Sequence, residues 1–137
     1  MRQIATLVLL FTVFHTLGQT SKEVTTPSGL RYVIEKAGTG QAAKSGDEVA
    51  IYETASYPGG QLVYSIEKPA PPLKIVLGRH DAIAGVEEGV TGMKIEEIRR
   101  LVVPPALSKR TEYPSSLSKD STLIYRIELV EIKKSKE

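Results

Sequence analysis

The alternation of apolar and polar positions predicts a strand followed by a short helix in the middle of the chain. Over residues 73–77 apolar side chains alternate up to Gly78, as in a half-buried strand that ends in a turn. The spacing then becomes helical, with one apolar face made by Ile83, Val86, Val90 and Met93. We expect Asp81 to cap this helix, because its carboxylate can accept a backbone N–H bond.

Two glycines interrupt the predicted helix. Glycine inside a helix costs about 1 kcal/mol relative to alanine, so Gly85 and Gly89 indicate that the helix backbone lies close against a sheet. Glu87, between them in the sequence, is expected to be exposed.

The same patterns extend over most of the chain. Strands are predicted over residues 30–36, 48–56, 62–67, 73–77, 97–103 and 122–132, and one helix over residues 82–92. A hairpin turn is expected at residues 57–60, and irregular segments at residues 68–72 and 106–121. Strands with short connections and a single helix predict an α+β fold, an antiparallel twisted β-sheet wrapped around one short α-helix.

The first eighteen residues resemble a cleavable export signal. Arg2 is followed by an apolar run of eleven residues from Ile4 to Phe14, and small residues stand near Gly18. A membrane anchor is the alternative, but the run is shorter than the roughly 20 residues that cross a bilayer. We therefore expect a periplasmic or secreted protein without stable membrane insertion after cleavage.

Composition excludes several classes of function. The 18 basic and 16 acidic residues are interspersed, which does not indicate a nucleic-acid-binding surface. There is no cysteine and no G-x-S-x-G segment, and beyond the export signal His80 is the only histidine, so thiol and serine-triad hydrolases lack their residues. His80 with Asp81 and the acidic pair at residues 87–88 is too sparse for a predicted metal site.

Several segments, in order, resemble FKBP-type peptidyl-prolyl isomerases. The helix region 83–89, Ile-Ala-Gly-Val-Glu-Glu-Gly, is similar to that family's Ile-x-Gly-Trp-Glu-Glu-Gly, and Leu77-Gly78 precedes it as in the family. Further similar segments are Ser28 to Val33, Gly38 to Gly40, Gly46 to Tyr52, Leu101 to Pro105 and Thr122 to Leu129. With the signal peptide at 1–18, the resemblance implies a linker at 19–27, an FKBP-like domain at 28–133 and a tail at 134–137.

The resemblance also implies a reaction and a site. Prolyl isomerisation needs no nucleophile and no cofactor, because an apolar pocket that favours the twisted amide lowers its barrier. The implied catalytic residues are Tyr52, Tyr64, Ile83 through its backbone N–H, and Tyr125. The implied substrate-binding residues are Val63, Leu73, Asp81, Ala82, Val86 and Leu117. The expected partners are proline-containing polypeptides among exported proteins.

The chain departs from the family pattern around this pocket. Val63-Tyr64-Ser65 stands where the family has Phe-Asp-Ser, Val86 stands where it has an aromatic floor, and Lys109 stands where it has a tyrosine. The loop at residues 117–123 also differs. The expected function is therefore peptidyl-prolyl isomerisation of reduced efficiency, which assists folding, and the alternative is a non-catalytic peptide-binding or chaperone module.

Overall fold

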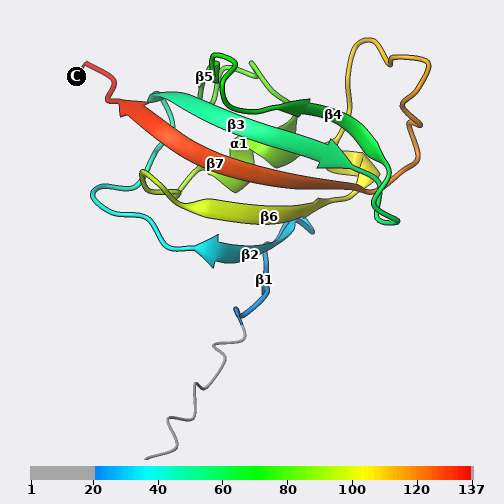
Figure 1. Ribbon diagram of the computed structural model, residues 1–137, viewed down its shortest axis with the longest axis horizontal. Helices are drawn as coiled ribbons and strands as arrows, with labels where there is room; N and C mark the ends of the chain where they lie inside the picture. The colour runs from blue at the N-terminus through cyan, green and yellow to red at the C-terminus, as the bar shows by residue number, and fades with distance from the viewer. Residues whose placement is uncertain (1–20, 137) are drawn as a thin grey trace, which may run out of the picture.

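Seven strands form one antiparallel sheet in the computed structural model, which describes residues 21–136 (Figure 1). The strands are β1 (Val24–Thr25), β2 (Arg31–Lys36), β3 (Glu48–Ser56), β4 (Leu62–Ile66), β5 (Leu73–Val76), β6 (Ile98–Val103) and β7 (Leu123–Lys133). Their order is β1-β2-β6-β7-β3-β4, and β5 pairs with β3 beside this path. The predicted α+β fold is confirmed.

The two longest strands, β3 and β7, lie side by side at the centre of the sheet (Figure 1). Successive side chains of a strand point to opposite faces, so every second residue of each strand enters the core. The buried side chains on this inner face include Val49, Ile51, Ala55, Leu123, Tyr125, Ile127 and Leu129.

One helix, α1 (Ala84–Val90), covers the inner face of the sheet, and a short 3-10 turn, η1 (Pro105–Leu107), follows β6. The two glycines of α1 allow the close approach that the sequence predicts. A Cβ at Gly85 would lie 2.5 Å from Cγ1 of Val103, and one at Gly89 would collide with the side chain of Leu101. The prediction of close helix–sheet packing is thus confirmed.

Two predictions about the helix are wrong. α1 begins at Ala84 with Ile83 as its N-cap, and no side chain caps it. The Asp81 carboxylate lies near the end of β5 instead and accepts the Val76 N–H at 2.9 Å. Glu87 is 8% exposed rather than solvated, because its carboxylate turns back towards the strand–helix turn.

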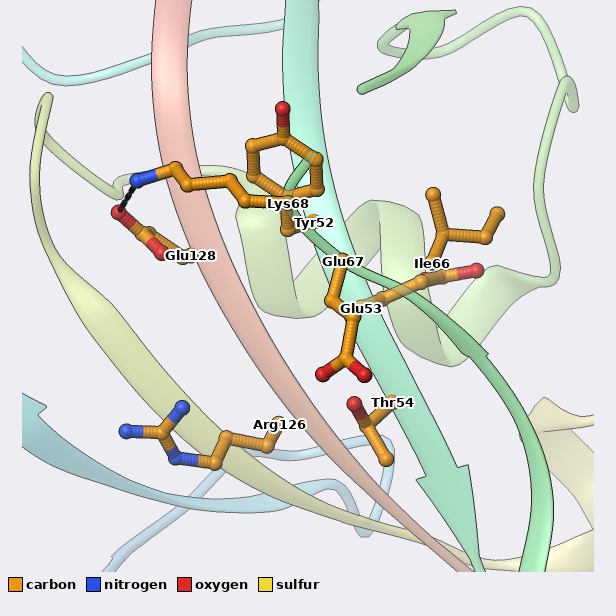
Figure 2. A pocket seen from close by; sticks show the side chains of 8 residues that line it. All are labelled: Tyr52, Glu53, Thr54, Ile66, Glu67, Lys68, Arg126 and Glu128. Atoms are coloured by element: carbon orange, nitrogen blue, oxygen red, sulfur yellow. Dashed lines mark hydrogen bonds and ion pairs between the residues drawn. The ribbon is translucent and has the colours of Figure 1, made fainter. Parts of the chain in front are cut away.

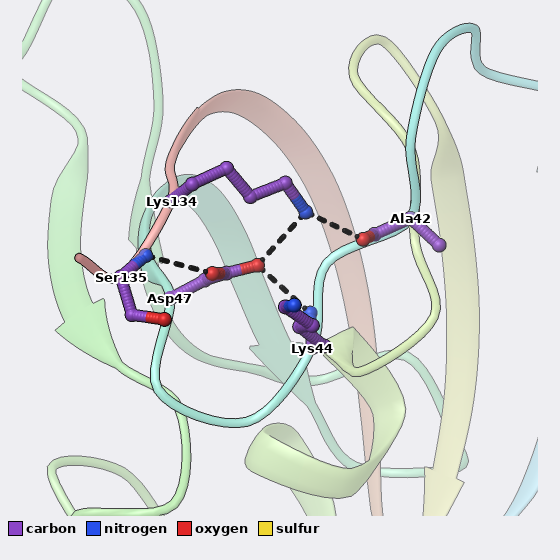
Figure 3. Close-up of polar contacts among 5 residues, drawn as sticks. All are labelled: Ala42, Lys44, Asp47, Lys134 and Ser135. Carbon is purple, nitrogen blue, oxygen red and sulfur yellow. Dashed lines mark hydrogen bonds and ion pairs between the residues drawn. The ribbon is translucent and has the colours of Figure 1, made fainter. Parts of the chain in front are cut away.

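A buried carboxylate joins the end of the chain to the loop before β3 (Figure 3). Asp47 is fully buried and accepts hydrogen bonds from Lys44 N at 3.0 Å, Lys134 Nζ at 3.0 Å and Ser135 N at 3.1 Å. Lys134 Nζ also donates to the Ala42 carbonyl at 2.9 Å. Burial alone raises the pKa of Asp47, but these hydrogen bonds outweigh it and hold the pKa below its usual value.

The predicted export signal and residues 19–20 of the predicted linker lie outside the described residues, and the rest of the linker includes β1. Within residues 21–136, no helix has the length and apolar character needed to cross a membrane.

Candidate functional site

A pocket opens between the start of α1 and the inner face of the sheet. Its cavity volume is about 270 Å³. That is just below the range of pockets for drug-sized ligands, so the pocket suits one or two side chains. The residues that line it are Glu53, Tyr64, Ile66, Leu73, Asp81, Ala82, Ile83, Val86, Arg110 and Tyr125.

The turn between β5 and α1 forms one wall of the pocket, and Glu87 holds that turn. Its two carboxylate oxygens accept the Gly78 N–H at 3.3 Å and the Ala82 N–H at 3.5 Å. Ile83 follows in an extended conformation, with φ −60° and ψ 151°. Its carbonyl accepts helix hydrogen bonds, whereas its N–H donates none among the described residues. This N–H is therefore free to bind a carbonyl of a ligand.

Four polar side chains meet at the sheet side of the pocket, from β3, β4, β7 and the loop after η1. Tyr64 Oη donates to Glu53 Oε1 at 2.5 Å. Arg110 Nη2 donates to Tyr125 Oη at 2.7 Å, and the two tyrosine rings meet edge to face with centroids 6.4 Å apart. Tyr113 Oη holds the loop by accepting the Arg110 N–H at 3.2 Å. We call Glu53, Tyr64, Tyr125 and Arg110 the polar cluster.

Burial dominates the electrostatics of the polar cluster. It raises the pKa of Glu53, although the hydrogen bond from Tyr64 and the charge of Arg110 act in the opposite direction. Burial likewise raises the pKa of Tyr64 and of Tyr125, so both phenols stay protonated and can donate.

Most of the residues predicted for the site lie together at this pocket. The cavity is lined by Tyr64, Leu73, Asp81, Ala82, Ile83, Val86 and Tyr125. Val63 is half-buried against the core and Leu117 is buried within it, and neither lines the cavity.

Tyr52 lies on the other face of the sheet, in a shallow groove (Figure 2). Its hydroxyl donates to the Ala70 carbonyl at 2.9 Å, and Lys68 Nζ stands 5.6 Å from the centre of its ring. Lys68 also pairs with Glu128 at 3.2 Å across this groove. The neighbour of Tyr52 in β3, Glu53, takes the place at the pocket that the sequence reasoning gave to Tyr52.

Three lining residues were missed by the sequence reasoning. The two-residue period of their strands could have predicted that Ile66 and Glu53 face the pocket. Arg110 lies in a loop whose path no local pattern predicts. Lys109, next to Arg110, lines a neighbouring hollow that also includes Ala82 and Ile83.

Residues 21–136 contain no cluster of three or more histidine, cysteine, aspartate or glutamate side chains placed to hold a metal ion. What the pocket offers is an apolar wall, a free backbone donor at Ile83 and the polar cluster. Such a site can grip a short peptide segment and bind one of its carbonyls.

Comparison with known proteins agrees with this arrangement. Residues 39–130 match the family described as FKBP-type peptidyl-prolyl cis-trans isomerase. The chain is 35% identical over 116 residues to "FK506-binding protein 4" of Mycosarcoma maydis, covering 83% of this chain and 31% of that protein. It is 33% identical over 107 residues to "FKBP-type peptidyl-prolyl cis-trans isomerase FkpA" of Buchnera aphidicola, covering 78% of this chain and 44% of that protein.

Solved structures share the fold. The crystal structure of FkpA from Escherichia coli superposes with a TM-score of 0.73 at 28% identity, over 83% of this chain and 53% of that one. The crystal structure of AtFKBP13 gives a TM-score of 0.70 at 21% identity, over 80% of this chain and 98% of that one, and shows the fold alone. The chain spans less than half the length of the Mycosarcoma maydis and Buchnera aphidicola relatives.

Proposed function

Because this chain belongs to the FKBP-type peptidyl-prolyl cis-trans isomerase family, we propose that it catalyses cis–trans isomerisation of X-Pro bonds with reduced efficiency. The observation that carries the proposal is the meeting of seven predicted site residues around one cavity beside the free N–H of Ile83.

The pocket supplies what this reaction needs. The barrier of about 18–20 kcal/mol comes from amide resonance, so a site lowers it by binding the twisted amide better than the planar one. Leu73, Ile83 and Val86 provide an apolar wall for the prolyl ring. The Ile83 N–H binds a neighbouring peptide carbonyl and so fixes the segment while the amide turns.

The reduced efficiency follows from what else lines the cavity. An apolar ring gains less from a wall that carries the Arg110 guanidinium, because this partly exposed charged group loses solvation without gaining a partner. Tyr64 offers no compensation, since its hydroxyl proton is already donated to Glu53. Val86 also gives less contact area than the aromatic floor usual in the family.

A protease-coupled assay on an X-Pro peptide tests the proposal, and Ile83→Pro sharpens it. Proline fits the φ of −60° at Ile83 and removes an N–H that holds no partner in the described structure, so folding should be kept. We expect kcat/KM to fall by up to about tenfold, the effect of one hydrogen bond.

Ala84→Pro is the matched control. Ala84 is the first residue of α1, where proline is tolerated, so the same substitution one position along should leave the rate unchanged. A wild type that folds but does not catalyse would refute the isomerase and favour the alternative, a peptide-binding or chaperone module that uses the same pocket.

We further propose that the protein is exported and acts on other exported polypeptides, whose slow X-Pro isomerisation limits folding. The apolar run from Ile4 to Phe14 supports this. Intact-mass measurement should find an exported form that begins near Gln19. A membrane-bound product that keeps residues 1–18 would contradict it.

A further inference from the structure

The hollow beside the pocket continues it along the surface. Its cavity volume is about 440 Å³, and two segments line it, residues 80–84 before α1 and residues 109–111 after η1. It shares four lining residues with the pocket, Ile83 among them, so the two cavities adjoin at the turn that presents the free Ile83 N–H. An extended peptide advances about 3.3 Å per residue. A peptide with its proline in the pocket can therefore place its next residues in the hollow.

The hollow has an excess of basic side chains. Lys109 and Arg110 come from the loop and His80 from the turn, whereas Asp81 is the one acidic residue of the described lining. Asp81 is already engaged, because one carboxylate oxygen accepts a backbone N–H of β5 at 2.9 Å and the other faces Arg79 Nε at 4.0 Å. The positive charges of the loop are therefore not balanced from within the hollow.

Lys109 is the cation best placed to meet a ligand. It is exposed, and none of the ion pairs among residues 21–136 includes it. Arg110 is half-buried and already donates from Nη2 to Tyr125, so it contributes chiefly its charge. His80 is exposed and offers an imidazole nitrogen as a further partner. A carboxylate fits this lining, because it accepts hydrogen bonds from several donors and carries the opposite charge.

Side chains two residues apart in an extended peptide point to the same side. A residue two positions from the proline therefore faces the protein, as the prolyl ring does. We propose that the hollow selects X-Pro segments with an aspartate or glutamate at that distance, its carboxylate facing Lys109. This specificity rests on the proposed function, since the prolyl ring occupies the adjoining pocket. The other carboxyl group nearby, Glu53, lines the pocket but not the hollow.

Four labelled peptides test this specificity on the purified protein. Each contains one Ala-Pro bond, with glutamate or its neutral isostere glutamine placed either two residues before the proline or two residues after it. Fluorescence anisotropy at low ionic strength should show one glutamate peptide binding about three- to tenfold more tightly than its glutamine counterpart. Only one position should respond, because the hollow adjoins one end of the pocket. The preference should shrink in about 1 M salt, where charges are screened beyond roughly 3 Å.

Lys109→Gln removes the charge at an exposed position, so it should abolish most of the preference and leave the affinity for the glutamine peptides unchanged. Lys94→Gln is the matched control, because it makes the same change at an exposed residue after α1 that lines neither cavity. Equal affinity for glutamate and glutamine peptides at both positions in the wild type would overturn the proposal, as would a preference that Lys109→Gln keeps. Isomerase activity on the glutamine peptides would leave the proposed function standing.

Discussion

At the scale of single residues, Glu53 is a carboxyl group with only 5% of its surface exposed. Because burial raises its pKa in the folded state, the native protein holds a proton that the unfolded chain releases. This group therefore lowers stability as pH rises from about 4, the usual glutamate range, through the raised value. Glu53→Gln cannot ionise, so its free energy of unfolding should exceed that of the wild type increasingly as pH rises.

Urea midpoints measured at several pH values check this expectation, with Glu67→Gln as an exposed control. A difference between wild type and Glu53→Gln that stayed constant with pH would show that folding does not raise the pKa of Glu53.

Asp47 should give a pH dependence of the opposite sign. Its hydrogen bonds hold the pKa below the usual value, so its contribution to stability is present above about pH 4 and is lost as pH falls through the lowered value. Asp47→Asn should lower the melting temperature near neutral pH and matter progressively less in acid. Asp120→Asn, at an exposed position, should change neither the melting temperature nor its dependence on pH. Thermal melts from neutral to acid pH compare the three proteins.

The contrast between Tyr52 and Glu53 shows how far sequence reasoning reaches at this scale. The two-residue period of Val49, Ile51 and Ala55 does indicate which face residue 53 occupies. A glutamate at an inward position nevertheless contradicts the apolar pattern, and a tyrosine looks like the better pocket residue. Only the partners that β3 meets in space, Tyr64 among them, make a buried carboxyl group acceptable.

At the scale of elements, α1 depends on the absence of a side chain at Gly85. Gly85→Leu should cost about 1–3 kcal/mol of unfolding free energy, because even its Cβ would lie 2.5 Å from Val103. Ala84→Leu is the matched control on the exposed side of the helix and should have little effect. Urea denaturation measures the loss of unfolding free energy in both variants, and equal losses would mean that the helix can move away from the sheet.

The sequence predicts elements better than it predicts their ends. Six strands and the helix were found at nearly their observed positions, because apolar periodicity reflects which face is buried. The helix start was misplaced since Asp81 can hydrogen-bond in either direction along the chain, and the chosen partner belongs to β5. Such a choice depends on tertiary contacts, as does the burial of Glu87.

At the scale of the whole molecule, β7 links the two halves of the sheet. It pairs with β6 on one side and with β3 on the other. A chain that ends at residue 121 would leave one edge of β6 and one edge of β3 without the strand that hydrogen-bonds to it. We expect it to show no cooperative urea transition, whereas removal of residues 136–137 alone should leave the transition in place. Circular dichroism during denaturation distinguishes the two.

The pairing of β3 with β7 also sets the order of events during synthesis. β3 leaves the ribosome before its partner β7, residues 123–133, which comes last among the described strands. Contacts between such distant segments form slowly, and here they cannot form at all until β7 has been translated. The nascent chain therefore lacks the central strand pair of its sheet for as long as the ribosome holds β7, so the sheet is completed only after β7 has been released.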